Sequence, residues 1–271
     1  NIELYIIQPD GSSLTRLTEN GVSDSNASWS PDGRYVVYQS RRDGNSADIY
    51  IMNGDGSHSV NLINDPADSP LDDFRPRWSP NGDHIALYTD RFYDPVQDCA
   101  LHRLAVMSIS EGMDSFRPQS TRPGNQETFG WGADGQTIYY TSFCQGREQY
   151  EGEFYTWNIT TDKVQRFTED GLIKAAPVWS HNGRYLAYQA AVEGQFDLFI
   201  YDSETGETVN LTNHPSQDAQ PSWSPDDSQI VFVTDRDGNN EIYIINRDGS
   251  ELRNISNHPG RDYEPTWSPV P

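Results

Sequence analysis

Short runs in which apolar and polar residues alternate recur along the whole chain, separated by turns rich in Asp, Asn and Gly. Alternation with a period of two is typical of β-strands. In the clearest unit, the pattern predicts strand A at Gln220–Ser224, strand B at Ile230–Thr234, strand C at Glu241–Asn246 and strand D at Leu252–Ser256. The Asp-Gly pairs between these runs supply the positive φ that tight hairpins need. Each unit is therefore expected to form four antiparallel strands.

A Trp-Ser-Pro-Asp-Gly phrase, or a variant of it, marks the end of each strand A. Its copies begin at Trp29, Trp78, Trp131, Trp179, Trp223 and Trp267, with spacings of 49, 53, 48, 44 and 44 residues. A period of about 40–45 residues with four short strands per unit indicates a β-propeller blade. Because such units bury their faces only by stacking in a ring, we predict one all-β domain over residues 1–271, a six-bladed β-propeller of four-stranded antiparallel blades.

The two ends of the chain are expected to share the sixth blade. Residues 1–7 align with residues 239–245, so the chain opens on strands C and D, whereas it closes on a strand A at Glu264–Ser268. The last blade is thus predicted to be divided between residues 1–18 and 262–269, and to be closed by pairing the N-terminal strands with the C-terminal strand. Its strand B is missing. Loss of an upstream segment is the favoured explanation, and an incomplete blade is the alternative.

Charge narrows the classes of partner. The formal net charge of −22 and the pI of about 4.4 argue against binding to nucleic acid or to an anionic membrane. Acidity is compatible with a basic partner, although solubility explains it more simply. The longest apolar runs fall short of the roughly 18–20 residues of a membrane span. Cys99 and Cys144 are expected in the same type of loop on neighbouring blades, where a disulfide and two free thiols are both open.

The sequence pattern of the clearest repeat unit is similar to that of a known family. Residues 221–250 run from a Pro-x-Trp-Ser-Pro-Asp phrase through Asp235-Arg236-Asp237-Gly238-Asn239 to an x-Ile-Tyr-x-x-Asn strand. This unit resembles the propeller repeat of the TolB family. The resemblance implies a bacterial protein in the periplasm or outside the cell, because most members are found there and TolB itself is a protein-binding subunit of a cell-envelope system. Related repeats also occur in the propellers of dipeptidyl peptidases and in oligogalacturonate lyases.

These observations favour a non-enzymatic protein-binding or scaffold propeller of the cell envelope or extracellular space, with a protein or peptide as its partner. The alternative is the propeller domain of a larger enzyme, either the gating domain of a serine peptidase or part of a carbohydrate-active lyase. The sequence contains no Gly-x-Ser-x-Gly elbow, and its histidines lack ligand spacing. No catalytic residue, metal or cofactor is predicted. The acidic run 235–241 lacks the twelve-residue arrangement of an EF-hand calcium loop.

Three long connections from consecutive blades are expected on one face of the disc, where the B–C and D–A loops lie. They are the D–A loop 65–75 and the B–C loops 90–102 and 144–152. Aromatic residues beside charged ones on variable loops are typical of a recognition surface. The predicted binding residues are Asp73, Phe74, Arg91, Phe92, Tyr93, Asp94, Arg147 and Tyr150. The alternative is ordinary loop variation, with the aromatic residues packing locally.

An acidic residue also recurs five positions before the tryptophan, where strand A begins. It is present at Asp24, Asp73, Asp218 and Asp262. Gln126 and Lys174 replace it in the other two blades, while Arg91 and Arg236 end strand B and are candidates to pair with such carboxylates. A structural ring of salt bridges is favoured over a polar funnel for a basic peptide end or a cation.

Overall fold

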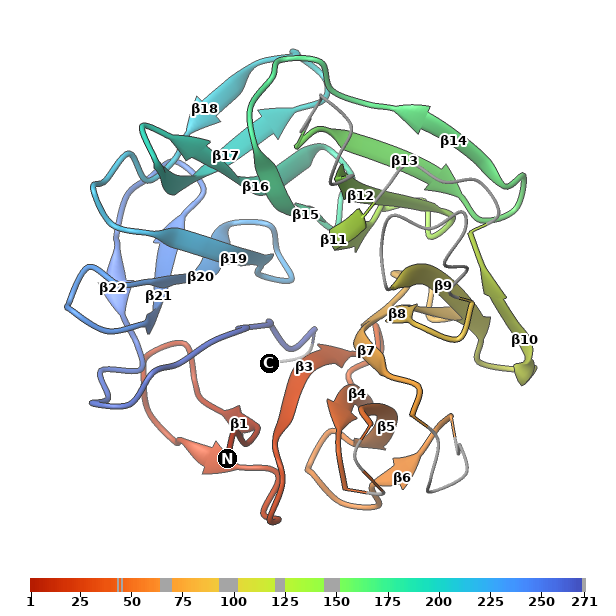
Figure 1. The fold of residues 1–271 in the computed structure, drawn as a ribbon. Coiled ribbons are helices and arrows are strands. Elements are labelled where there is room, and N and C mark those ends of the chain that lie inside the picture. The colour runs from red at the N-terminus through yellow and green to blue at the C-terminus, as the bar shows by residue number, and fades with distance from the viewer. Residues whose placement is uncertain are drawn as a thin grey trace.

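The structure is a computed structural model in which the sheets form a ring around a central axis (Figure 1). Within each blade the first strand lies nearest the axis and the fourth lies at the rim, so the strands correspond to the expected order A to D. The structure describes residues 1–42, 44, 46–63, 70–92, 102–119, 125–143 and 152–269.

The described residues form five four-stranded antiparallel sheets. In chain order, the strands of these blades are β3 (Asp24–Trp29), β4 (Tyr35–Ser40), β5 (Asp48–Asn53) and β6 (Val60–Asn61); β7 (Asp73–Trp78), β8 (His84–Thr89), β9 (Arg103–Ser108) and β10 (Gly112–Pro118); β11 (Asn125–Trp131), β12 (Thr137–Phe143), β13 (Phe154–Asn158) and β14 (Lys163–Arg166); β15 (Lys174–Trp179), β16 (Tyr185–Val192), β17 (Gln195–Asp202) and β18 (Thr208–Asn210); β19 (Asp218–Trp223), β20 (Gln229–Thr234), β21 (Glu241–Asn246) and β22 (Arg253–Asn254). We call each blade by the tryptophan that ends its first strand.

The expectation of six four-stranded blades is wrong for the described chain. The sixth sheet has two strands, β1 (Tyr5–Ile6) and β2 (Thr15–Arg16), and residues 262–269 enter no strand ladder among the described residues. The predicted ladder between the N-terminal strands and the C-terminal strand is likewise absent from the described residues. The physical reason is that no described strand lies between β1 and residues 262–267, whereas in the five four-stranded blades the second strand lies between the first and third and bonds to both.

The repeated phrase has a clear local role at the turn after the first strand. Ser30 Oγ donates to Asp32 Oδ1 at 2.7 Å and accepts from the Tyr35 backbone N–H at 2.9 Å. Gly33 then adopts a φ of 69°, a left-handed conformation that a residue without Cβ takes readily. The serine and the Asp or Asn therefore fix the hairpin, which is why this phrase repeats.

The tryptophans join neighbouring blades. Trp223 is buried, its ring lies 6.2 Å from that of Tyr185 in the preceding blade, and its indole N–H donates to the Val178 carbonyl at 3.1 Å. Trp131 makes the matching bond to the Arg77 carbonyl at 3.0 Å. Because flat apolar rings between sheets bury a large area, they supply much of the packing that holds the blades together.

A second contact between blades lies next to the axis. The third residue of the first strand has a φ between 51° and 56° at Asn26, Arg75, Ala176, Gln220 and Glu264. Its N–H bonds to a side chain of the preceding blade, as when Glu264 N donates to Gln220 Oε1 at 2.9 Å and Asn26 N donates to Glu264 Oε2 at 2.7 Å. Residues 262–267 thus keep the backbone conformation of a first strand without its ladder.

Candidate binding site on the long-loop face

The carboxylates that open the first strands are held in ion pairs. Asp73 and Asp218 are fully buried, with exposed fractions of 0%. Arg91 Nε lies 3.0 Å from Asp73 Oδ2, and Arg236 Nη2 lies 3.0 Å from Asp218 Oδ1, which confirms the predicted pairing. Arg42 pairs with Asp24 in the same way, at 3.1 Å. A buried charge is tolerated when it is paired and hydrogen-bonded, so these residues tie the first strand to the end of the second.

The Trp179 blade reverses the sign of this pair. Lys174 replaces the aspartate and is buried, and its Nζ lies 3.1 Å from Glu153 Oε2 and also contacts the Asp170 carboxylate. Burial raises the pKa of Glu153, but hydrogen bonds from Thr168, Gly171 and Lys174 outweigh that effect and hold the pKa below its ordinary value. The ion pair is therefore kept although the sequence position carries a lysine. Gln126 lies in β11, where the side chain is outside the described residues.

The predicted aromatic residues of the Trp78 blade pack in two places. The ring of Phe74 lies 5.6 Å from Tyr88 and 4.6 Å from His102, so it belongs to the packing between strands. Phe92 is half-buried and lies 5.6 Å from Phe116. The Arg91 guanidinium lies 5.8 Å from the centroid of that same Phe116 ring. Arg91, Phe92 and Phe116 thus form one cluster, which we call the Phe92 cluster.

Sequence reasoning missed Phe116 as a member of this cluster. The fourth strand of this blade, β10, runs over Gly112–Pro118, and its pairing register shifts between Gly112 and Arg117. This irregular strand lacks the sequence pattern of the other fourth strands, so the repeat could not be used to locate it. The aromatic residue itself, one position before Arg117, was the only clue.

The long connections begin and end on neighbouring blades. β8 ends at Thr89 and β9 begins at Arg103, and β12 ends at Phe143 and β13 begins at Phe154. By contrast, β16 ends at Val192 and β17 begins at Gln195. Figure 1 places the Trp78 and Trp131 blades side by side. We call the face with the B–C and D–A connections the long-loop face.

The structure therefore brings together half of the predicted site. Asp73, Phe74, Arg91 and Phe92 lie at the long-loop end of the Trp78 blade, the first three within its packing and ion pair and Phe92 at the start of the long connection. The other predicted binding residues and the two cysteines lie outside the described residues. They are Tyr93, Asp94, Arg147, Tyr150, Cys99 and Cys144.

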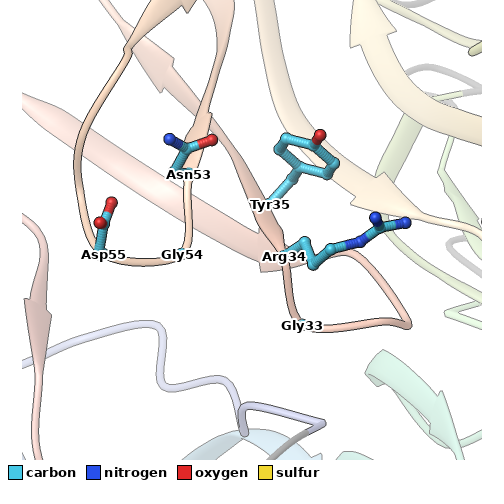
Figure 2. Close-up of a pocket in the computed structure, with 6 residues that line it drawn as sticks. All are labelled: Gly33, Arg34, Tyr35, Asn53, Gly54 and Asp55. Atoms are coloured by element: carbon cyan, nitrogen blue, oxygen red, sulfur yellow. The ribbon is translucent and has the colours of Figure 1, made fainter.

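The opposite face carries a shallow hollow, which Figure 2 shows in the Trp29 blade. It is lined by the A–B turn with Gly33, Arg34 and Tyr35 and by the C–D turn with Asn53–Asp55. The Arg34 side chain points away from the second turn (Figure 2) and pairs with Asp32 at 2.6 Å. None of the predicted binding residues lines the hollow, so it serves as a reference surface.

The described residues form neither a metal-binding cluster nor a membrane-spanning helix. Among the described residues, no three His, Cys, Asp or Glu side chains gather closely enough to hold an ion. In the acidic run 235–241, Asp235 Oδ1 accepts from Gln217 N at 2.9 Å, and Asp237 accepts from Asn254 Nδ2 at 3.0 Å. These carboxylates thus serve the blade itself. The described chain has no helix that is long and apolar enough to span a membrane.

Comparison with known proteins agrees with this architecture. Residues 113–270 match the family described as the TolB beta propeller domain. The structure of a putative TolB from Agrobacterium tumefaciens superposes with a TM-score of 0.76 at 16% identity, covering 98% of this chain and 93% of that one. TolB from Acinetobacter baumannii gives a TM-score of 0.74 at 21% identity, covering 98% and 62%. Likenesses at this level of identity concern the fold.

A sequence relative carries a different description. An uncharacterized peptidase, YuxL, of Bacillus subtilis is 23% identical over 195 residues, which span 70% of this chain and 25% of the relative. The chain covers between 17% and 47% of the length of the curated relatives that it matches. Since the family match extends over more than half of the sequence and the blades have the expected strand order, the chain belongs to the TolB beta propeller domain family.

Proposed function

We propose that this chain is a non-enzymatic protein-binding propeller whose contact surface is the long-loop face around the Phe92 cluster. The observation that carries the proposal is the position of Phe92. Phe92 directly follows Arg91, which forms the buried ion pair with Asp73. Its half-buried ring packs against Phe116, and it lies at the start of the long connection that follows β8. An aromatic residue held by a rigid blade at the edge of variable loops is suited to anchor a partner.

The buried aspartates that open the first strands stabilise the blades that carry this face. Because Asp24, Asp73 and Asp218 are buried and paired with arginines, their charge is neutralised within the blades. The proposed contact therefore relies on aromatic and loop residues, while the net charge of −22 favours approach of a basic protein or peptide over an acidic one. We place the protein in the periplasm or outside the cell, by analogy with the TolB-named relatives.

The test compares the two faces of the disc. Phe92→Ala with Tyr93→Ala removes the proposed anchors, and Tyr35→Ala removes an aromatic residue that is 39% exposed on the reference surface. Each protein is mixed with cell-envelope extract, cross-linked, and its partners are counted by mass spectrometry. We expect the double variant to capture at least about tenfold less of a partner than the wild type does, as for loss of an aromatic hot spot. Tyr35→Ala should retain capture. Equal capture by all three proteins would refute the assigned surface.

A second candidate function is the propeller domain of a larger peptidase. The match to YuxL favours it, since 70% of this chain aligns with only 25% of that relative. Under this alternative, the natural gene would also encode an α/β domain with a Ser-Asp-His triad. Sequencing the complete gene and treating the purified natural protein with a fluorophosphonate probe separates the two candidates. Active-site labelling of a serine would favour the peptidase and argue against the non-enzymatic role.

A further inference from the structure

Asp90 and His102 are the first and last residues of the long connection that contains Phe92. β8 ends at Thr89 and β9 begins at Arg103, and these two residues pair in the ladder. The next position along each strand therefore sets Asp90 beside His102, one step beyond the last pair. Both residues are half-buried. The root of the connection thus contains an acid and a histidine that are partly shielded from water.

Asp90 is anchored to the chain that leads into β7 by two hydrogen bonds. Its Oδ1 accepts from the Asp72 N–H at 2.9 Å, and its own N–H donates to the Asp72 carbonyl at 3.2 Å. Asp72 in turn contacts the preceding blade, where its Oδ1 accepts from the Ala47 N–H at 2.6 Å and lies 3.4 Å from Arg41 Nη2. A change at Asp90 therefore acts on the contact between the two blades.

The His102 ring is packed in a way that suits the neutral imidazole. It lies edge-on to Phe74, with ring centroids 4.6 Å apart and planes at 84°. Its Nδ1 is buried and has no hydrogen-bond partner among the described residues. A proton on this nitrogen would place a charge with an unpaired N–H in an apolar contact, which is costly. Burial accordingly lowers the pKa of His102 below its ordinary value.

Charged groups surround His102 from each neighbouring element. They are Asp90 after β8, Asp72 before β7, Arg75 within β7 and Arg103 at the start of β9. The two carboxylates favour an imidazolium, but burial outweighs them and Arg75 opposes them. Burial also raises the pKa of Asp90, so acid weakens its attraction for the ring. The packed arrangement is therefore favoured above about pH 6.5, the ordinary pKa of histidine, and is lost as the pH falls below that value.

The Trp223 blade has the same acidic anchor without a titratable neighbour. Asp235 Oδ1 accepts from the Gln217 N–H at 2.9 Å, the same distance as in the Trp78 blade. The residue before the third strand, which is His102 in the Trp78 blade, is Asn240 here. The anchor thus recurs in another blade, whereas the histidine beside it does not.

We propose that Asp90 and His102 form an acid-sensitive latch, which holds the root of the long connection on the first strand at neutral pH and opens at mildly acidic pH. On protonation the imidazole leaves Phe74 for water, and the anchor of Asp90 loosens. Histidine is the side chain whose charge changes in this range. The inference rests on the proposed function, since Phe92 lies two residues after Asp90 and the latch would regulate partner binding at that face.

Hydrogen exchange of single amides tests the latch without a partner. It is measured by NMR at pH 7.5 and pH 5.5 and corrected for the intrinsic rates. We expect the protection of the Asp72 amide to fall at least about fivefold at pH 5.5, while that of the matched Gln217 amide changes by less than about twofold. His102→Phe keeps a ring against Phe74 but cannot take a proton, so the Asp72 amide should stay protected at both pH values.

The variant His102→Asn copies the Trp223 blade and should also abolish the pH dependence. Unchanged protection in the wild type, an equal loss at the Asp72 and Gln217 amides, or a loss that persists in His102→Phe would each overturn the latch. The last result would assign the effect to a carboxyl group, because His102→Phe retains Asp90 and Asp72.

Capture from cell-envelope extract separates the regulation from the proposed function. The wild type should capture at least about fivefold less of a partner at pH 5.5 than at pH 7.5, whereas His102→Phe should capture it equally at both. Capture by the wild type that does not change with pH would overturn the regulation. Absence of capture at either pH would refute the proposed function, while the latch itself is decided by the amide protection.

Discussion

The Trp78 and Trp223 blades carry the same ion pair in different settings. In both, an arginine at the end of the second strand reaches a fully buried aspartate of the first strand. In the Trp223 blade, Arg236 stacks on Phe232 and Tyr243, and the next residue, Asp237, turns directly into β21. In the Trp78 blade, the residue after the arginine is Phe92, and the chain leaves the sheet for a long connection.

This comparison separates scaffold from site. The ion pair recurs in the Trp29, Trp78 and Trp223 blades, where it joins the first strand to the end of the second, so it reflects the structure of the blade and not a partner. An aromatic ring beside the arginine recurs, since Phe116 lies against Arg91 as Phe232 and Tyr243 lie against Arg236. The local departure from the repeat is Phe92, whose place in the Trp223 blade is taken by Asp237. Function is therefore sought where the two blades differ.

The largest effect is expected from removal of the Asp–Arg ion pair that the two blades share. Arg91→Ala and Arg236→Ala each leave a fully buried aspartate without its cation, which should lower the free energy of unfolding by about 3–5 kcal/mol in both blades. Urea unfolding followed by tryptophan fluorescence measures this. A loss of less than about 1 kcal/mol in either blade would break the comparison, because the pair would then not be a common structural element.

The next largest effect is expected at Phe92, where the two blades differ. Phe92→Ala should weaken partner capture about tenfold while changing the unfolding free energy by less than about 1 kcal/mol, since the ring is only half-buried. The matched change in the Trp223 blade, Asp237→Ala, should leave capture unchanged. If Phe92→Ala instead destabilises the fold strongly and leaves capture intact, the Phe92 cluster is packing and the binding surface lies elsewhere.

The smallest effect concerns acid stability of the A–B turns. Hydrogen bonds from Ser224 and Ser228 lower the pKa of Asp226 to about 2, whereas the Trp78 blade has Asn81 at this place. Since the folded pKa is depressed, the contribution is present above about pH 4 and is lost as the pH falls toward 2. Asp226→Asn should remove it, at less than about 1 kcal/mol because the group is exposed. Asn81→Asp should introduce the same pH dependence, and no change in either variant would contradict the assignment.

Much of the fold could be predicted from the sequence, because the repeated residues are the ones that the turns and the packing between blades require. The Ser30 and Asp32 pair, the glycine with positive φ and the buried Trp223 each follow from the repeated phrase. The number of complete blades could not be predicted in the same way. Residues 262–267 have the sequence of a first strand, but a ladder also requires a neighbouring strand, and none of the described strands pairs with this segment.

The site was predicted less completely, for related reasons. The Asp73–Arg91 pair was predictable, because the Trp223 blade repeats it. The contact of Phe92 with Phe116 could not be predicted, because β10 lacks the repeated sequence pattern and its pairing register shifts. The buried pair of Lys174 with Glu153 could not be predicted from the repeat, since Glu153 lies in the preceding blade, directly before β13, and a lysine replaces the aspartate at this position.

Exchange of one connection tests the central claim most directly. Residues 90–102 of the Trp78 blade are replaced by residues 235–240 of the Trp223 blade, which keeps an arginine in the second position for the buried pair with Asp73. Partner capture is measured with the chimera and with a control in which residues 235–240 are replaced by a Gly-Ser linker that retains the arginine. We predict that the chimera folds but loses capture, while the control retains it. A folded chimera that captures the partner as well as the wild type would contradict the account.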